Sequence, residues 1–201
     1  MSALDLVEAL RVLQEQRGRD DVVISAMGAA REWMQLGSHP LDWIFVPSSM
    51  GQATSLGLGL ALARPDRRVI VLNGDGGLLM NLGSLVTITA YAPANLITLL
   101  FDNGIYEVTG AQPTPAAPEG RGDRERVSFA ALARAAGFRA VFEYHTLDGW
   151  RAGLPELLET RGPSFALLPV APIPGAKGPR SPGPAPERAR AFMAALDATI
   201  G

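Results

Sequence analysis

Residues 69–106, VIVLNGDGGLLMNLGSLVTITAYAPANLITLLFDNGIY, decide the fold of this chain. Val69 to Leu72 and Leu96 to Phe101 are largely apolar runs without polar alternation, which is typical of strands covered on both faces. Between them, the spacing predicts a helix from about Met80 to Tyr91. A strand, a helix and a second strand in this order build a unit of a parallel sheet.

The same alternation extends along the rest of the chain. Ser2, followed by Asp5, predicts a helix N-cap, because Leu6, Leu10 and Leu13 then recur at helical spacing. We therefore predict one domain over residues 1–201, an α/β fold in which a mainly parallel sheet lies in a three-layer α/β/α sandwich. Further strands are expected at 22–24, 43–46, 139–142 and 165–170, and further helices at 28–36, 51–63, 127–136, 147–158 and 187–200.

Two segments have the composition of loops. Residues 112–126 are rich in proline and charge, and residues 171–186 are dense in proline and glycine. We expect both segments to be mobile.

Composition excludes several classes of function. The net charge of −2 implies no basic face, which argues against nucleic acid as a partner. No uncharged apolar run is long enough to span a membrane, and the N-terminus lacks the apolar run of a signal peptide. The absence of cysteine excludes thiolate chemistry and is typical of a cytoplasmic protein. Neither a Walker motif nor a GxGxxG turn is present.

Oxygen ligands follow two of the predicted strands. Asp75 comes directly after one buried strand, and Asn103 comes directly after the next. Because ligands of open parallel sheets bind beyond the carboxyl ends of the strands, these two side chains are expected at one edge. A carboxylate, an amide oxygen and a backbone carbonyl suit a hard cation such as Mg²⁺. An isolated Gly-Asp-Gly is more often a plain turn, and it is Asn103 that favours the metal site.

Gly-Asp-Gly followed at this distance by an asparagine resembles the cofactor-binding motif of thiamine diphosphate (ThDP) enzymes. The resemblance implies that Asp75 and Asn103 bind the metal through side chains, and Ile105 through its backbone carbonyl. It also implies that Gly76 and Gly77 bind the diphosphate through backbone N–H groups. The family often has two asparagines at this point, and here the first is Asp102.

A second segment, PSSMG at residues 47–51, agrees with this resemblance. ThDP decarboxylases carry a bulky apolar residue that bends the cofactor, and Met50 stands at that position, although Met50 could instead be core filler. Many relatives have glycine where Ser48 stands. The full cofactor-binding set implied by the resemblance is Gly28, Ser48, Ser49, Met50, Gly74, Asp75, Gly76, Gly77, Asn103, Ile105 and Tyr106.

Four segments together resemble a narrower branch, the sulfopyruvate decarboxylase beta subunits and phosphonopyruvate decarboxylases. These segments are VISAMGAAREW, SSMGQATSLGLGLAL, NGDGGLLMNLGSL and FDNGIYEVTGAQPT. Tyr106 is closer to the sulfopyruvate branch. Arg31 and Glu32 match the pattern of this branch. Three roles are open for them: lining the active site, contacting a subunit, or forming a surface ion pair. Glu107, Gln112 and Thr114 could close over a substrate.

The glutamate that activates ThDP belongs to a pyrimidine-binding domain, which this chain has no room to contain. We therefore expect a partner subunit that supplies it, within a homo- or hetero-oligomer, and a small 2-oxo acid as substrate. Alternatives that the sequence leaves open are carboligation of the acetolactate synthase kind and a non-catalytic ThDP-binding module.

Overall fold

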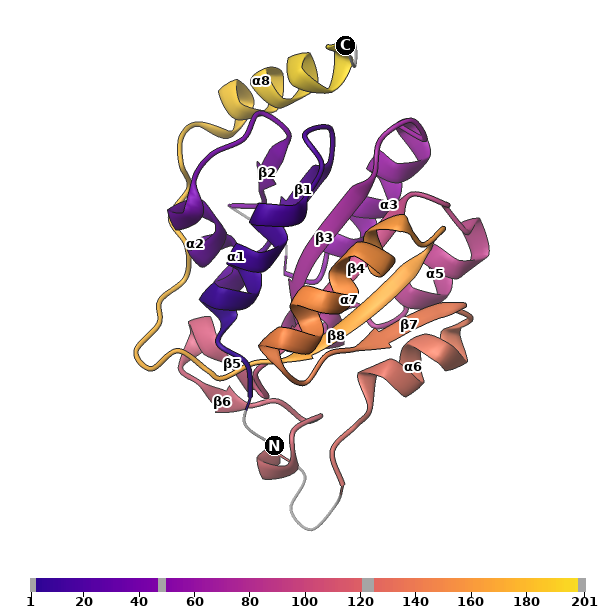
Figure 1. The fold of residues 1–201 in the computed structure, drawn as a ribbon. Helices are drawn as coiled ribbons and strands as arrows, with labels where there is room; N and C mark the ends of the chain where they lie inside the picture. The colour runs from indigo at the N-terminus through magenta and orange to yellow at the C-terminus, as the bar shows by residue number, and fades with distance from the viewer. Residues whose placement is uncertain (1–2, 47–49, 121–124, 199–201) are drawn as a thin grey trace.

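Six parallel strands form the central sheet of the protein (Figure 1). The structure is a computed structural model that describes residues 3–46, 50–120 and 125–198. The strand order is β2-β1-β3-β4-β8-β7, and every pairing between neighbours is parallel. The strands are β1 (Val22–Ser25), β2 (Asp42–Ile44), β3 (Val69–Gly74), β4 (Leu96–Asp102), β7 (Ala140–Glu143) and β8 (Ser164–Pro169).

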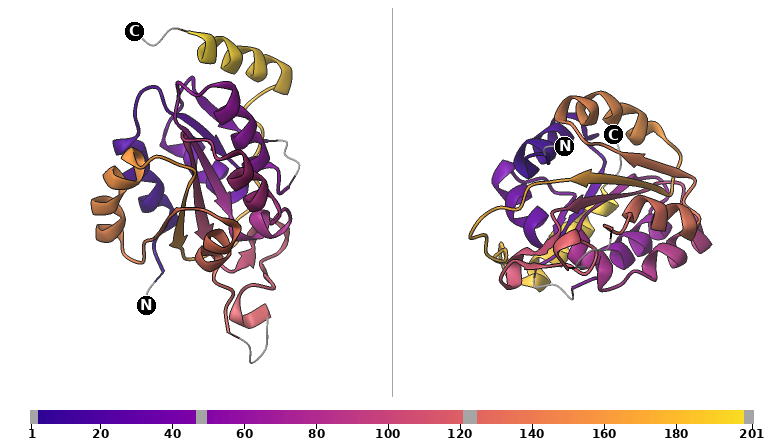
Figure 2. Two further views of the ribbon diagram at one scale, coloured as in Figure 1. Left: turned by 90° about the vertical axis from the view of Figure 1, so that its right-hand side faces the viewer. Right: turned by 90° about the horizontal axis from the view of Figure 1, so that it is seen from below.

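Helices cover both faces of this sheet, and the three-layer α/β/α fold expected from the sequence is confirmed (Figure 2). One face carries α1 (Leu6–Gln16), α2 (Met27–Leu36) and α7 (Leu147–Glu159). The other face carries α3 (Ala53–Ala63), α5 (Ser84–Tyr91) and α6 (Phe129–Ala136).

The strand residues divide between the two cores by simple alternation. On β3, Val69 and Val71 pack towards α3 and α5, whereas Ile70 and Leu72 pack towards α1 and α2, and all four are fully buried. Successive side chains of a strand point to opposite faces, so a strand buried on both sides must be apolar at every position. This requirement explains why the apolar runs of the sequence mark the central strands.

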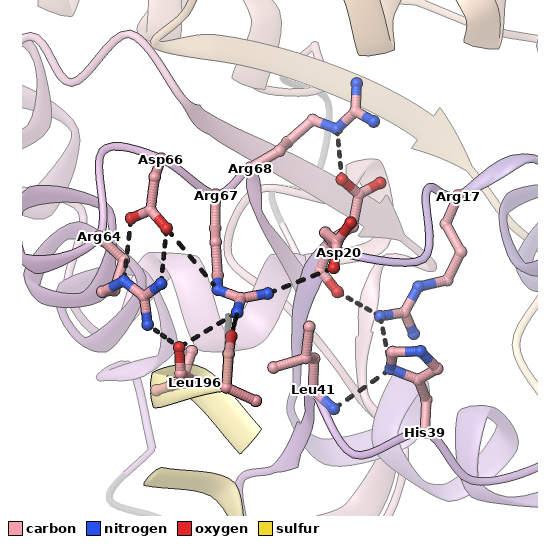
Figure 3. A network of polar contacts seen from close by, with 11 residues as sticks. Arg17, Asp20, His39, Leu41, Arg64, Asp66, Arg67, Arg68 and Leu196 are labelled. Atoms are coloured by element: carbon pink, nitrogen blue, oxygen red, sulfur yellow. Dashed lines mark hydrogen bonds and ion pairs between the residues drawn. The ribbon is translucent and has the colours of Figure 1, made fainter. Parts of the chain in front are cut away.

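The last helix, α8 (Ala185–Asp197), docks at the end of the molecule away from the hairpin of β5 (Ile105–Tyr106) and β6 (Gln112–Pro113) (Figure 1). Its Phe192 ring lies 5.4 Å from the Trp43 ring, and the Arg188 guanidinium lies 4.9 Å above the same ring. Arg64 and Arg67 both donate to the Leu196 carbonyl (Figure 3), and Arg67 also donates to Ala198 at 2.7 Å. Two cations therefore satisfy the carbonyl groups at the end of α8, where the helix dipole is negative.

The helix expected from Met80 to Tyr91 is confirmed from Ser84 onward, whereas its predicted start at Met80 was wrong. A short helix, α4 (Asp75–Leu79), begins directly after β3, and α5 begins only at Ser84. Asn81 lies in the turn between them and donates to the Gly51 carbonyl at 3.1 Å and to the Ser55 hydroxyl at 3.2 Å. These long-range bonds hold the turn against the start of α3.

Two smaller features also differ from expectation. The N-cap of α1 is Asp5, whose carboxylate accepts from the Glu8 N–H at 3.0 Å, while Ser2 lies outside the described residues. The segment after β4 forms a short antiparallel hairpin of β5 (Ile105–Tyr106) and β6 (Gln112–Pro113), separated by the 3₁₀ turn η1 (Glu107–Thr109).

The two segments expected to be loops hold some anchored residues. In the first, η2 (Pro118–Gly120) follows Thr114, Ala116 and Ala117, which are all buried. Mobility of these segments, and the boundaries of a single domain at 1–201, stay predictions. Among the described residues, no helix has the length and apolar character needed to cross a membrane.

Candidate cofactor and metal site

A pocket lies at the carboxyl ends of β1, β3 and β4. The chain runs from β1 to β2 on one side and later to β3 on the other, so the strand order reverses at β1. Ligands of open α/β sheets bind at such reversals. The residues that line the pocket are Leu6, Met27, Gly28, Ala29, Met50, Gly74, Asp75, Gly76, Gly77, Met80, Phe101, Asn103, Ile105, Tyr106, Glu107, Val108, Thr109 and Val170.

Nine of the eleven residues expected to bind cofactor line this pocket. The other two, Ser48 and Ser49, lie outside the described residues. Parallel pairing explains the convergence, because Gly74 of β3 is in register with Phe101 of β4 and both chains then leave the sheet at one edge.

Asp75 is the most deeply buried acidic group of the site, at 1% exposure. Burial, together with the nearby charge of Asp102, raises the pKa of Asp75 to about 7, although hydrogen bonds from Thr114 and from the backbone of Gly76 and Asn103 act in the opposite direction. No arginine, lysine or histidine forms an ion pair with Asp75 in the described part of the chain. A buried carboxylate without a cation is unfavourable, and a bound metal ion would supply the missing charge.

At three glycines of the site, a Cβ would lie too close to another side chain. A Cβ on Gly76 would lie 2.7 Å from the Tyr106 ring, and a Cβ on Gly77 would lie 2.6 Å from the Asn73 amide oxygen. A Cβ on Gly28 would lie 2.7 Å from a Glu107 carboxylate oxygen. The bare backbone at Gly76 and Gly77 therefore lets an anionic group approach the N–H groups at the start of α4.

Asn103 and Ile105 complete the set of expected metal ligands. The Asn103 amide oxygen accepts from the Ile105 N–H at 3.1 Å, and its nitrogen donates to Glu107 at 3.4 Å. No group of three or more histidine, cysteine or acidic side chains able to hold a metal occurs in the described ranges. A metal ion here would therefore need the amide oxygen of Asn103, a backbone carbonyl and oxygens of the cofactor, as Mg²⁺ bound to a diphosphate does.

Met50 lines the pocket and is 47% exposed. The following residue, Gly51, has φ of +84°, and a Cβ there would lie 3.1 Å from Met80 Cβ. This left-handed turn is one that glycine adopts without strain. Met50 is thus an apolar side chain presented to the pocket rather than packed in the core, which removes the alternative of core filler.

The remaining polar candidates have different outcomes. Arg31 does not line the pocket, because its guanidinium bonds Glu32 at 2.5 Å and Glu107 at 3.0 Å. Thr114 is fully buried and donates to Asp75, whereas Gln112 is exposed and donates to the Thr109 carbonyl. The sequence carries no spacing signal for the other lining residues, which were not predicted: Leu6, Met27, Ala29, Met80, Phe101, Val108, Thr109 and Val170.

Comparison with known proteins agrees with this geometry. Residues 24–166 match the family described as thiamine pyrophosphate enzyme, C-terminal TPP binding domain. Phosphonopyruvate decarboxylase of Streptomyces viridochromogenes is 37% identical over 191 residues, which cover 93% of this chain and 46% of that protein. Sulfopyruvate decarboxylase subunit beta of Methanothermobacter thermautotrophicus is 37% identical over 170 residues, which cover 83% of this chain and 84% of that one.

The fold has solved counterparts as well. A putative thiamin diphosphate-dependent enzyme from Mycobacterium smegmatis superposes with a TM-score of 0.68 at 18% identity, over 85% of this chain and 32% of the other. The chain spans less than half the length of the phosphonopyruvate decarboxylases that it matches. The match over most of the sheet and its pocket shows that the chain belongs to the thiamine pyrophosphate enzyme family, as a C-terminal TPP binding domain.

Proposed function

We propose that this chain is the diphosphate- and Mg²⁺-binding part of a ThDP-dependent 2-oxo acid decarboxylase, which converts a 2-oxo acid into an aldehyde and CO₂. The observation that carries the proposal is the buried carboxylate of Asp75, which lies beside Asn103 and has no cationic partner among the described residues. A carboxylate held in this way suits a divalent cation that also bridges to phosphate oxygens.

In this proposal each residue of the pocket has one task. Asp75, Asn103 and the Ile105 carbonyl hold the metal ion, and the N–H groups of Gly76 and Gly77 hold the diphosphate. Gly28 and Gly74 line the space for the cofactor, Tyr106 lines the pocket against Gly76, and Met50 would support the bent form of the cofactor. Ser48 and Ser49 stay candidates for contacts with the pyrimidine ring. When bound, ThDP supplies the electron sink for loss of CO₂.

The apolar walls of the pocket also favour a reaction that takes place away from water. Leu6, Met27, Val108 and Val170 give the pocket an apolar lining around its few polar groups. An apolar wall strengthens the electrostatic interactions of a bound charged cofactor and keeps water from reactive species.

For the substrate, we propose a 2-oxo acid with an anionic tail, with sulfopyruvate favoured. The chain covers 84% of the length of a sulfopyruvate decarboxylase subunit beta at 37% identity, so the two chains correspond over nearly their whole extent. Phosphonopyruvate is the second candidate, supported by equal identity to a phosphonopyruvate decarboxylase over 93% of this chain.

We further propose a partner that contributes the pyrimidine-binding domain and its activating glutamate. The similar sulfopyruvate decarboxylase chain is itself designated subunit beta, which supports assembly with a second kind of subunit. The cysteine-free sequence supports a location in the cytoplasm.

Calorimetric titration tests the cofactor part of the proposal. Mg²⁺ and ThDP are titrated into the chain alone and into its complex with the candidate partner, with Asp75→Ala as the matched variant. We expect binding that requires Mg²⁺, that is tighter in the complex, and that Asp75→Ala abolishes. Equal binding by Asp75→Ala would refute the metal site. Assays of the complex with sulfopyruvate, phosphonopyruvate and pyruvate then separate the substrate candidates.

A further inference from the structure

The carboxylate of Glu107 accepts three hydrogen bonds from three separate parts of the chain. Its Oε1 accepts from Asn103 Nδ2 at 3.4 Å and from the Ile173 N–H at 2.9 Å. Its Oε2 accepts from Arg31 Nη2 at 3.0 Å. The Glu107 side chain is only 7% exposed, so these bonds form largely out of solvent.

The bond to Asn103 fixes how the Asn103 amide is oriented. A carboxylate can only accept, so Glu107 holds the NH₂ group of the amide on its own side. The Asn103 oxygen must then point the other way, where it accepts from the Ile105 N–H. A metal ligand needs its oxygen, not its nitrogen, towards the cation, and an acidic neighbour selects that orientation.

The bond to Ile173 connects the same carboxylate to residues 171–184, which we call the strap. The strap runs from the end of β8 to α8 along one side of the molecule (Figure 1). Arg31 Nη1 also donates to the Lys177 carbonyl of the strap at 2.8 Å. Ala171 and Ser181, nearer its two ends, donate to the Leu4 and Val46 carbonyls. Between the strap and the η1 turn lies a cavity of about 540 Å³, which shares Ile105, Glu107 and Val108 with the cofactor pocket.

We infer that Glu107 is a positioning residue that orients the metal ligand Asn103 and couples it to closure of the strap. This inference rests on the proposed metal site. It assigns Glu107 a task beyond lining the pocket, because its carboxylate joins Asn103, Arg31 and Ile173.

Glu107→Gln is the informative substitution. A glutamine offers one acceptor and one donor, so either its NH₂ group faces the Arg31 guanidinium or it faces Asn103 Nδ2 and the Ile173 N–H. In both cases two donor groups face each other, so Glu107→Gln loses its bond either to Arg31 or to Asn103 and Ile173. Glu15→Gln is the matched control, because Glu15 pairs with Arg151 at 2.9 Å and is absent from the pocket lining.

Two measurements on the complex with its partner subunit test the coupling. The first is the Mg²⁺ concentration dependence of ThDP binding, which we expect to weaken about 10-fold in Glu107→Gln and to stay unchanged in Glu15→Gln. The second is amide hydrogen exchange, in which Ile173 should lose at least about 10-fold protection. In the unsubstituted protein, Mg²⁺ with ThDP should slow exchange in the strap, and Glu107→Gln should remove that response.

The outcomes separate this inference from the proposed function. If Asp75→Ala loses Mg²⁺-dependent binding while Glu107→Gln keeps both normal binding and a protected strap, the inference is overturned and the function stands. If the unsubstituted protein shows no Mg²⁺-dependent binding, both are overturned. Should Glu107→Gln fail to fold, Glu107→Asp replaces it, since the shorter carboxylate keeps its charge but cannot reach all three partners.

Discussion

The Thr114 hydroxyl donates a hydrogen bond to the Asp75 carboxylate at 3.2 Å, across 39 positions of sequence. The β5–β6 hairpin brings the two together, because the Thr114 N–H bonds the Gly104 carbonyl at 2.8 Å as the hairpin closes. Thr114 is fully buried, so its hydroxyl has Asp75 as its hydrogen-bond acceptor. The hairpin after β4 thus acts on the carboxylate after β3.

Thr114→Val should weaken the proposed metal site while leaving the fold intact. Valine keeps the shape of threonine but removes the donor, which costs roughly 1 kcal/mol of stability. We expect Mg²⁺-dependent ThDP binding to fall about 10-fold, because the carboxylate loses a bond that orients it. Thr87→Val, which removes a weak exposed bond to the Gly83 carbonyl, is the control. Unchanged titration curves for Thr114→Val would contradict this expectation.

Asp75→Asn should stabilise the metal-free protein, and only at the higher pH. The folded-state pKa of Asp75, about 7, lies above that of the unfolded chain, so the unfolded state loses its proton first as pH rises. The loss of folding stability caused by the buried Asp75 carboxylate therefore grows between about pH 4 and pH 7, and it stays constant above that range. Removing the charge should then raise stability on the order of 1–3 kcal/mol at pH 8, and change little at pH 4.

Thermal denaturation of the metal-free protein at the two pH values measures this effect. Asp66→Asn is the contrasting variant, because the bond from Arg64 lowers the pKa of Asp66. The stability that the ionised Asp66 carboxylate contributes is present above the pKa of the unfolded chain and is lost as pH falls. Asp66→Asn should therefore lower the Tm at pH 8. If the Tm of Asp75→Asn at pH 8 were lower than that of the unsubstituted protein, the buried charge of Asp75 would not be destabilising.

Two glycines of α3 should respond in opposite ways to a methyl group. A Cβ on Gly57 would overlap Val71 of β3, whereas a Cβ on Gly59 meets nothing within 4 Å. Gly57→Ala should therefore destabilise the protein by about 1–3 kcal/mol through overpacking. Gly59→Ala should stabilise it by roughly 0.5–1 kcal/mol, since glycine is unfavourable inside a helix. Chemical denaturation compares the pair, and equal effects would contradict the close packing of α3 against β3 at Gly57.

The sequence predicts the core of this site better than its surroundings. The placement of Asp75 beside Asn103 follows from parallel strands alone, since such strands end at one edge. The turn that separates α4 from α5 could not be predicted from the sequence, because Asn81 in that turn bonds Gly51 and Ser55, which are far away along the chain. The bonds of Thr114 and Glu107 likewise depend on tertiary closure of short turns, which leaves no periodic pattern in the sequence.

Arg67→Met should release α8 from the sheet. Arg67 is 3% exposed and donates to the Leu196 and Ala198 carbonyls, so its loss leaves Arg64 as the one of these two cations that still holds the end of α8. We expect a loss of about 1–3 kcal/mol and faster proteolysis between residues 180 and 198. Arg134→Met removes only an exposed pair with Glu143 and is the control. Proteolysis at the rate of the unsubstituted protein would mean that Arg64, Phe192 and Arg188 hold α8 without Arg67.

The positions of Leu4 and of α8 at opposite ends of the molecule have a practical consequence for attaching a tag to the protein (Figure 1). Leu4 pairs with Val170 beside the cofactor pocket, and Leu6 lines that pocket, whereas α8 ends at the far side of the molecule (Figure 1). An affinity tag or a biosensor attachment placed after residue 198 would therefore leave the pocket open to ligand and partner. The same attachment placed before residue 3 would join the chain close to Leu4 and Leu6, so the two versions should differ in measured binding even though the folded domain is identical.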